Sequence, residues 1–528
     1  MSSAAPSAGP VGPTSDGPGS DGPASRVAPR TILRPGDVIN QAQWPTDRTV
    51  TSVHVIRIGG AGMSAVARLA LEAGLAVSGS DSQDGQFIGP LREAGAVIGI
   101  GFDPSLLSDQ VDVVVVSTAV RADNPEVLEA RRRGIPVIHR AAALAGLLAG
   151  RELVAVAGTH GKTSTTGMAV MALRGAGADP AWALGAAVPD LGRNAGFAAL
   201  PAPMPGGAAA ARPGRGIAVV EADESDGSFL AFTPRSLVVT NLEADHLDFH
   251  GDPVTLTAAF DTLTGQLETD GTLVVCADDP GARALGERAA RTGTAVISYG
   301  AAADASWRIT AERSGASGTE VELDTPHGPL RLELAVAGHH NVLNALGALA
   351  AVTAAAPDLD PAALAAGLAS FTGASRRFDV AGISGGVTVV DDYAHHPREV
   401  AATIEASRAI VEAQQRGGRV LVVFQPHLFS RTRDFAADFA AALSGADRAW
   451  VMPVYAARED PDPSIDATTI TDLVAGTVVA ALTAAEQVAP QVAAAARPGD
   501  LLLMLGAGDV VETTPLVMAA LEASGEES

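Results

Sequence analysis

The chain has 528 residues, a formal net charge of −24 at pH 7 and a single cysteine, Cys276. That length exceeds one hydrophobic core, so about two to four domains are expected. The negative charge argues against non-specific binding to nucleic acid or to an anionic membrane. One cysteine excludes an internal disulfide framework, and no apolar run reaches the ~18 residues of a membrane span. We therefore expect a soluble cytoplasmic protein.

The N-terminal segment changes character near residue 51. Residues 1–30 are mostly Pro, Gly and Ser without apolar periodicity, and we predict a disordered tail. Residues 53–58 form an apolar strand pattern, followed by Gly59-Gly60-Ala61-Gly62-Met63-Ser64-Ala65 and a helical pattern to about residue 73. Further strand and helix patterns follow, which predicts a first α/β domain over residues 31–149.

This first glycine-rich turn fits the dinucleotide-binding fingerprint in its alanine variant, Gly60-x-Gly62-x-x-Ala65. The next strand ends at Asp81, near the distance at which an acidic residue meets ribose hydroxyls. The placement of the turn between strand and helix predicts a nucleotide-diphosphate site, because a helix N-terminus attracts anions. The motif does not identify the nucleotide.

A second glycine-rich turn opens the next domain. An apolar strand over 153–157 is followed by Gly158-Thr159-His160-Gly161-Lys162-Thr163 and a helix ending near residue 175. The spacing is shorter than that of the common GxxxxGKT loop, but Lys162 is the only lysine in the chain. A compact ammonium fits between phosphate oxygens where a planar guanidinium does not. We predict an ATP site.

Two acidic clusters follow apolar strands of the same domain, residues 221–226 (EADESD) and 241–248 (NLEADHLD). Parallel sheets bind ligands where strands end, so both clusters are expected to face the crevice that holds Lys162. Carboxylates beside a triphosphate predict Mg²⁺, with the Thr163 hydroxyl as a further ligand. The imidazole of His246 is an unusual ligand for Mg²⁺ and is more typical of Mn²⁺ sites or of a hydrogen-bond donor. Residues 201–216 are expected to form a loop.

A third block begins near residue 375. Its predicted strands, at 388–390, 420–424, 450–453 and 501–505, each end in a polar or glycine motif, which predicts a second doubly wound domain over 375–528. The adjacent histidines His395 and His396 cannot both face one point from a regular element, and no cysteine accompanies them, so zinc is not favoured. Residues 150–374 are assigned to the central domain.

Taken together, the motifs resemble the Mur ligases. The matching motifs, in family order, are GGAGMS (59–64), GTHGKT (158–163), EADESDGSF (221–229), NLEADHLDFHG (241–251), GHHNVLNAL (338–346), RRFD (376–379), DDYAHHP (391–397) and FQPHLFSRT (424–432). The resemblance implies an α/β protein of three domains: a Rossmann-like UDP-binding domain, a central P-loop-type ATPase domain and a Rossmann-like C-terminal domain. The implied activity is ATP-dependent amide formation between the lactyl carboxylate of UDP-N-acetylmuramate and L-alanine, through an acyl phosphate, in peptidoglycan synthesis.

The resemblance also implies roles for individual residues. The implied catalytic set is Lys162, Glu221, His246, Arg377 and Asp392. ATP would be bound by Gly158, Thr159, His160, Gly161, Lys162, Thr163, Ser164, Asn341, Asn344 and Arg377. The UDP substrate would be bound by Gly59, Gly60, Ala61, Gly62, Met63, Ser64, Asp81, His160, Tyr393, His396 and Arg431. Two Mg²⁺ ions, with Mn²⁺ as an alternative, would be held by Thr163, Glu221 and His246. A monomer or weak homodimer is expected.

Two features depart from the family pattern, and three other functions compete. Ser164 stands where threonine is common, and the carbamylated lysine that sister ligases place near the second metal is excluded because Lys162 is the sole lysine. A recycling ligase that attaches a preformed peptide to UDP-N-acetylmuramate shares most motifs. A nicotinamide oxidoreductase would leave Lys162 unexplained, and a non-enzymatic P-loop switch would need neither the first glycine-rich turn nor the third domain.

Overall fold

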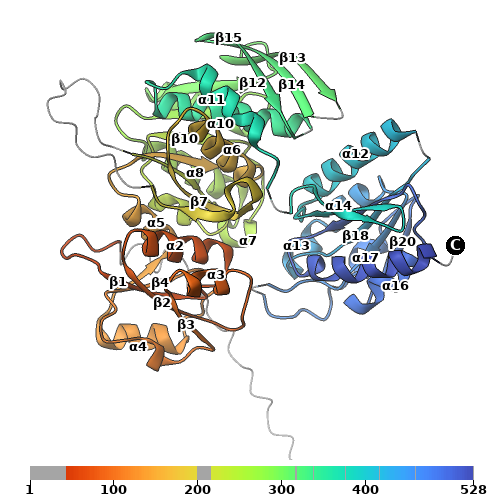
Figure 1. The fold of residues 1–528 in the computed structure, drawn as a ribbon, viewed down its shortest axis with the longest axis horizontal. Helices are drawn as coiled ribbons and strands as arrows, with labels where there is room; N and C mark the ends of the chain where they lie inside the picture. The colour runs from red at the N-terminus through yellow and green to blue at the C-terminus, as the bar shows by residue number, and fades with distance from the viewer. Residues whose placement is uncertain are drawn as a thin grey trace, which may run out of the picture.

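The computed structural model describes residues 43–526 except 199–215, 316–317, 337, 375, 416 and 458. The predicted tail (1–30) and nearly all of the predicted loop at 201–216 lie outside the described residues. Three sheets form three bodies that follow one another along the chain (Figure 1). No helix within the described residues is long and apolar enough to cross a membrane.

The N-terminal body is a parallel sheet in the order β3-β2-β1-β4-β5. This order places the strand switch beside β1, where a Rossmann-like sheet binds its nucleotide. Strand β4 is buried along its whole length, as expected for a parallel strand covered on both faces. The elements are β1 Ser52–Ile56, α2 Ala61–Glu72, β2 Ala76–Asp81, α3 Ile88–Glu93, β3 Val97–Ile100, η1 Pro104–Leu106, β4 Val113–Val116, α4 Pro125–Arg133, β5 Val137–His139 and α5 Arg140–Leu147.

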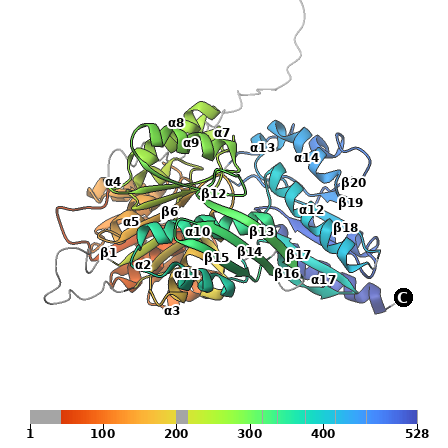
Figure 2. The ribbon, with the colours of Figure 1, turned by 90° about the horizontal axis from the view of Figure 1, so that it is seen from above.

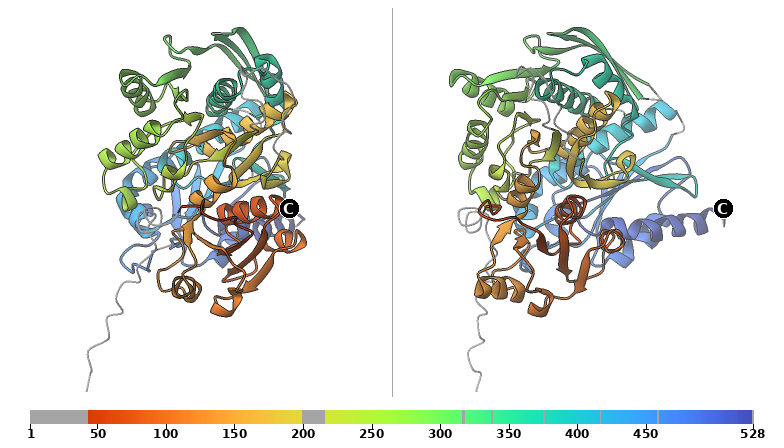
Figure 3. Two further views of the ribbon diagram at one scale, coloured as in Figure 1. Left: turned by 90° about the vertical axis from the view of Figure 1, so that its left-hand side faces the viewer. Right: turned by 60° about the vertical axis from the view of Figure 1, so that its left-hand side comes forward.

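The central body is a larger mixed sheet in the order β15-β14-β13-β12-β11-β10-β6-β9-β7-β8. Its middle strands are parallel, and the antiparallel strands β13–β15 lie at the end far from the N-terminal body (Figure 3). The strands are β6 Glu152–Ala157, β7 Ala181–Val188, β8 Arg193–Gly196, β9 Ile217–Glu221, β10 Ser236–Val239, β11 Thr272–Cys276, β12 Ala295–Gly300, β13 Trp307–Gly315, β14 Gly318–Thr325 and β15 Gly328–Leu334.

Three helices of the central body begin at an Asp-Pro pair that the sequence marks clearly. Asp252, Asp279 and Asp360 each precede a proline and accept a hydrogen bond from a first-turn N–H, which is the usual N-cap arrangement with proline at the first helical position. The helices are α6 Lys162–Gly175, η2 Pro189–Leu191, η3 Ser228–Ala231, α7 Leu247–His250, α8 Pro253–Gly265, α9 Pro280–Arg291, α10 His339–Ala355, α11 Pro361–Gly367 and η4 Leu368–Ser370.

The C-terminal body has the sheet order β16-β17-β21-β18-β19-β20, parallel except for β16. Viewed from above, it lies beside the other two bodies, which overlap one another in that view (Figure 2). Its elements are β16 Asp379–Ser384, β17 Val387–Asp392, α12 Pro397–Gln414, β18 Val420–Phe424, α13 Phe429–Asp434, α14 Ala436–Leu443, β19 Arg448–Val451, α15 Thr468–Thr471, β20 Val478–Ala481, η5 Ala485–Gln487, α16 Val488–Ala493, β21 Leu501–Leu505 and α17 Val510–Glu526.

Candidate active site

The turn between β6 and α6 has the geometry of a phosphate-binding loop. Gly158 and Gly161 have φ values of +126° and +81°, which favour glycine. A Cβ on Gly161 would lie 2.5 Å from Asn344 Oδ1, so the predicted Asn344 packs against this loop from α10. Helix α6 has no side-chain N-cap, and its first-turn N–H groups are therefore open to an anion. Asn341 lies one turn before Asn344 on α10.

Lys162 is held inside this loop by three oxygen acceptors. Its Nζ donates to the carbonyls of Gly158 (2.7 Å) and Thr159 (3.1 Å) and to the Glu224 carboxylate (3.0 Å). Burial disfavours the ammonium, but Glu224 and Asp223 outweigh it and raise the pKa of Lys162. Burial raises the pKa of Glu224 itself to about 7, against the lowering effect of Lys162. Lys162 is therefore charged, beside a carboxyl group that titrates near neutrality.

The predicted metal ligands contact different carboxylates of the 221–226 loop. Thr163 Oγ1 donates to Glu221 Oε2 (2.9 Å), and the same carboxylate oxygen accepts from the N–H of Gly185 (2.8 Å). His246 has a φ of +54°, uncommon for a residue with a side chain, and its Nε2 lies 3.8 Å from Glu224 Oε1. Burial lowers the pKa of His246 to about 4, so its imidazole is neutral and able to bind a metal.

The donors suit a hard divalent cation, since a hydroxyl and a carboxylate oxygen are what Mg²⁺ prefers and a neutral imidazole is tolerated by Mn²⁺. However, no hydrogen bond or ion pair joins His246 to Glu221 in the part of the chain that the structure describes. Nor do the described residues contain a group of at least three His, Cys, Asp or Glu side chains arranged to hold a metal. The two halves of the predicted metal site thus stand apart in this arrangement.

The predicted UDP loop follows β1. The N–H of Gly59 donates to Asp81 Oδ2 (2.8 Å), which ties the turn to the end of β2. Met63 and Ser64, in contrast, have buried side chains, and the Ser64 hydroxyl donates to the Ala61 carbonyl. Ser64 Oγ also accepts a hydrogen bond from Asn194 Nδ2 (2.9 Å) on β8, so this predicted side chain faces the central body, against which α2 packs.

Asp392 holds together two segments of the C-terminal domain. It accepts from the N–H groups of Phe378 (2.8 Å) and Ala394 (2.7 Å), joining the RRFD and DDYAHHP motifs. The adjoining Arg377 guanidinium lies 5.2 Å from the centre of the Tyr393 ring and 3.5 Å from Glu399 Oε1. Asp392 thus acts on the site through the backbone, whereas Arg377 can reach toward a ligand.

A histidine cluster joins the phosphate loop to the C-terminal domain. His160 Nδ1 lies 3.0 Å from Glu399 Oε1, and the ring centres of His160 and His396 are 5.2 Å apart. Glu399 also accepts from the N–H of His395 (3.0 Å) at the start of α12. Burial lowers the pKa of His396 to about 4, so its ring is neutral. Sequence reasoning missed Glu399, although its place three residues after His396 is a helix-capping signal.

A second contact between these domains is an ion pair. Arg431 Nη2 donates to Asp245 Oδ1 (2.7 Å), and it lies 3.5 Å from His246 Nδ1. The predicted Arg431 thus reaches the acidic cluster at 241–248. Asp245 belongs to that predicted cluster, but sequence reasoning gave it no individual role. Near Arg431, the rings of Tyr393, His395, His427 and Tyr455 contact one another in series.

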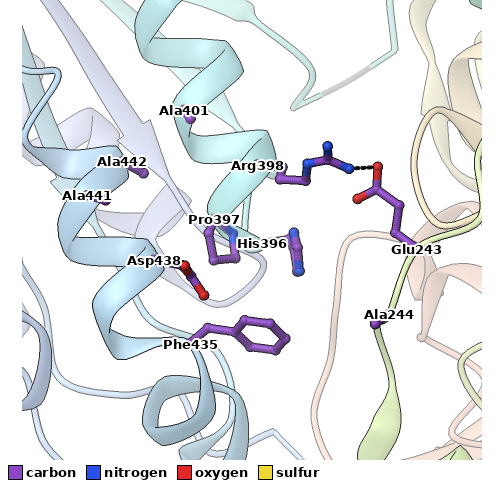
Figure 4. A pocket seen from close by; sticks show the side chains of 10 residues that line it. All are labelled: Glu243, Ala244, His396, Pro397, Arg398, Ala401, Phe435, Asp438, Ala441 and Ala442. Carbon is purple, nitrogen blue, oxygen red and sulfur yellow. Dashed lines mark hydrogen bonds and ion pairs between the residues drawn. The ribbon is translucent and has the colours of Figure 1, made fainter. Parts of the chain in front are cut away.

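An open pocket of about 640 Å³ lies between the central and C-terminal domains (Figure 4). Glu243 and Ala244 line one side, and α12, Phe435 and α14 line the other. Arg398 and Glu243 form an ion pair across it, and His396 projects between Arg398 and Phe435 (Figure 4). His396 both lines this pocket and contacts His160, so the pocket adjoins the contact between the phosphate loop and the C-terminal domain.

Comparison with known proteins identifies the class. Family models match in chain order: the Mur ligase family catalytic domain over residues 52–152, the Mur ligase middle domain over 156–352 and the Mur ligase glutamate ligase domain over 376–508. The chain belongs to the Mur ligase family, and this confirms the three-domain α/β fold predicted from the motifs.

Relatives of similar sequence point to one enzyme within the Mur ligase family. The chain is similar to the UDP-N-acetylmuramate–L-alanine ligases of Paenarthrobacter aurescens (48% identical, covering 89% of this chain and 97% of the relative) and Kineococcus radiotolerans (48%, 89% and 96%). Among solved structures it is similar to UDP-N-acetylmuramate–alanine ligase MurC from Thermotoga maritima, with a TM-score of 0.72 and 27% identity over 90% of this chain and 99% of that one. A murein peptide ligase from Psychrobacter arcticus shares the fold, with a TM-score of 0.65 and 22% identity over 89% and 99%.

Proposed function

We propose that this protein is an ATP-dependent ligase that joins L-alanine to the lactyl carboxylate of UDP-N-acetylmuramate in peptidoglycan synthesis. The observation that carries the proposal is the position of the only lysine. Lys162 is charged and partly buried in a phosphate loop, beside the acidic loop that follows β9, and a second glycine-rich loop follows β1. Relatives 44–48% identical, matched over nearly their whole length, carry this activity in their names.

The reaction requires activation of a carboxylate, which an amine does not attack unaided. The γ-phosphoryl group of ATP is transferred to the lactyl carboxylate, giving ADP and an acyl phosphate. The neutral amine of L-alanine then attacks the acyl carbon, and phosphate leaves from the tetrahedral intermediate. Lys162 and Arg377 are the cations placed to neutralise charge on the transferred phosphoryl group. Contacts of the C-terminal domain with the phosphate loop serve to keep water from the acyl phosphate.

We assign the remaining residues as follows. Residues 158–164 with Asn341, Asn344 and Arg377 bind ATP, and residues 59–64 with Asp81 bind the UDP portion of the substrate. His160, Tyr393, His396 and Arg431 surround the reacting carboxylate and the amino acid. Thr163, Glu221 and His246 are the proposed ligands for two Mg²⁺ ions, which supply charge neutralisation at the phosphates. We place the UDP-binding, ATP-binding and C-terminal domains at 31–149, 150–374 and 375–528, and the reaction in the cytoplasm.

The test is phosphate release from ATP in the presence of Mg²⁺ and UDP-N-acetylmuramate, with each candidate amine added in turn. Release that depends on L-alanine, with a product heavier by one alanyl residue, is the expected result. Release only with a tripeptide would identify the recycling ligase, whose fold the Psychrobacter structure shares. No release with any pair would reject ligation altogether. Glycine is expected to react weakly, since losing one methyl contact costs about 1–3 kcal/mol.

A further inference from the structure

The two nucleotide loops lie in different domains, and one arginine connects them. Arg140 is the first residue of α5, and α5 packs against both α2 and η3, the short helix that follows the acidic loop of the central domain. Sequence reasoning gave Arg140 no role, because nothing in its neighbourhood distinguishes it from the other arginines. The tertiary structure shows that its two terminal nitrogens, Nη1 and Nη2, contact two different loops.

The Nη1 nitrogen of the guanidinium lies against the UDP loop. A Cβ on Gly62 would lie 2.5 Å from Arg140 Nη1, so this nitrogen sits directly on the glycine. Gly62 is the second residue of α2, whose N-cap Gly60 has no side-chain cap and whose first turn holds no acidic residue. A diphosphate on this helix end would therefore meet the Arg140 nitrogen next to the open N–H groups.

The Nη2 nitrogen of the guanidinium contacts the acidic loop beside Lys162. Arg140 Nη2 donates to Asp223 Oδ2, and Asp223 precedes Glu224, the carboxylate that binds Lys162. Burial disfavours the charged form of Asp223, yet Arg140 and Lys162 hold its pKa well below the usual range. Two further contacts tie α5 and β4 to this loop: His139 Nε2 lies 3.5 Å from Asp226, and Thr118 donates to the same carboxylate (3.2 Å).

We propose that Arg140 is a positioning residue that bridges the two nucleotide sites, donating through Nη1 to the diphosphate of the UDP substrate and through Nη2 to Asp223. This inference rests on the proposed function. The bound UDP substrate then fixes the position of the guanidinium, and the guanidinium fixes Asp223. Because Glu224 follows Asp223 in the 221–226 loop, the carboxylate that binds Lys162 is positioned as well. Binding of the UDP substrate and of ATP is consequently coupled in both directions, as any equilibrium coupling must be.

The experiment measures dissociation constants by calorimetry on the full chain with Mg²⁺. UDP-N-acetylmuramate is titrated with and without a non-hydrolysable ATP analogue. In the wild type, the analogue is expected to tighten binding of the UDP substrate. Arg140→Gln is expected to weaken that binding about tenfold to a hundredfold, the loss typical of one charge-assisted hydrogen bond, and to abolish the tightening. Arg140→Lys is expected to keep part of the affinity but not the coupling, because an ammonium cannot donate in two fixed directions.

The matched control is Arg193→Gln. Arg193 donates to Glu72 (2.7 Å), so it also joins the central domain to α2, but at the far end of that helix from the UDP loop. This variant is expected to retain wild-type affinity and coupling. Asp223→Asn alters the acceptor of Arg140 Nη2 instead of the arginine itself. This variant is expected to lose the coupling while its affinity for the UDP substrate is not weakened.

The outcomes separate this inference from the proposed function. A wild-type chain that binds no UDP-N-acetylmuramate would reject the function itself. A wild-type chain that binds and ligates, but whose Arg140→Gln variant behaves like Arg193→Gln, would overturn the bridging role alone. If Arg140→Gln does not fold, Arg140→Lys and Asp223→Asn serve as the test. Wild-type coupling in both variants would then overturn the bridging role of Arg140.

Discussion

Arg431 of the C-terminal domain donates a hydrogen bond to Asp245 of the central domain at 2.7 Å, and both side chains are about 4% exposed. Removing either partner leaves the other charge buried and uncompensated, which costs more than the pair itself contributes. We expect Arg431→Ala and Asp245→Ala each to destabilise the protein by about 3–5 kcal/mol, and the double variant by clearly less than their sum. Urea unfolding of the four proteins of this cycle measures the coupling. Additive losses would show that the pair is not formed in solution.

Replacing the sole lysine by arginine tests the phosphate loop. Lys162 has three oxygen acceptors around one compact ammonium, and a planar guanidinium cannot satisfy them within the same space. Lys162→Arg is expected to lower kcat about 100-fold or more, the usual cost of losing one transition-state donor. Arg288→Lys, which alters an exposed pair with Asp261, is the control and is expected to ligate normally. Near-normal kcat for Lys162→Arg would contradict the proposed role.

Two glycines with nearly the same positive φ allow backbone strain to be measured separately from steric crowding. Gly161 and Gly177 have φ values of +81° and +79°, but only Gly161 has a close neighbour, Asn344 Oδ1 at 2.5 Å from a built Cβ. Gly177→Ala is expected to cost about 1 kcal/mol from backbone strain alone. Gly161→Ala should cost more and should also weaken ATP binding. Thermal unfolding with and without ATP measures both effects, and equal behaviour of the two variants would reject the packing of Asn344 on the loop.

Acid stability is expected to depend on His396. Burial lowers its folded-state pKa to about 4, whereas an unfolded histidine titrates near ~6.5. Between these values the unfolded chain binds a proton that the folded chain does not, so stability rises with pH across this window. The contribution of about 3 kcal/mol is fully present above pH ~6.5 and is lost as the pH falls toward 4.

Urea unfolding of wild type and His396→Gln at several pH values between 4 and 7 checks this expectation. The variant should show a shallower loss of stability on acidification. His339→Gln, which alters a half-exposed ring beside Glu312, serves as the control and should follow the wild-type curve. The same slope in His396→Gln and wild type would mean that His396 is not buried in solution. His246 also has its pKa lowered by burial, so part of the acid sensitivity should persist in the variant.

The parts of the site that sequence reasoning identified are those in which strand, turn and helix are contiguous. The loop from Gly158 to Thr163 and the loop from Gly59 to Ser64 are each specified within about twenty residues by an apolar run followed by glycines. In the first of these loops, Gly158 and Gly161 also adopt the positive φ values that favour glycine. The uniqueness of Lys162 is likewise visible in composition alone. Caps such as Asp279 before Pro280 set helix starts for the same local reason.

The partners of these loops depend on the tertiary structure. His160 meets Glu399 across 239 positions, and Arg140 meets Asp223 across 83. Along the sequence, one arginine or glutamate resembles another, because its own neighbours do not encode which distant charge it will face. Packing of α5 between α2 and η3, and of α12 against the phosphate loop, selects those pairs.

The sequence by itself therefore determined the family, the three-domain α/β class and the positions of the two glycine-rich loops, since each depends on short-range periodicity and on motifs that are contiguous in the chain. The tertiary structure decided which carboxylate holds Lys162, that the side chains of Met63 and Ser64 are buried, with Ser64 against Asn194 of the central domain, and that Arg140 joins two domains. These depend on long-range packing and on the burial of charges, where the free energy of a group is set by its neighbours in space rather than along the chain.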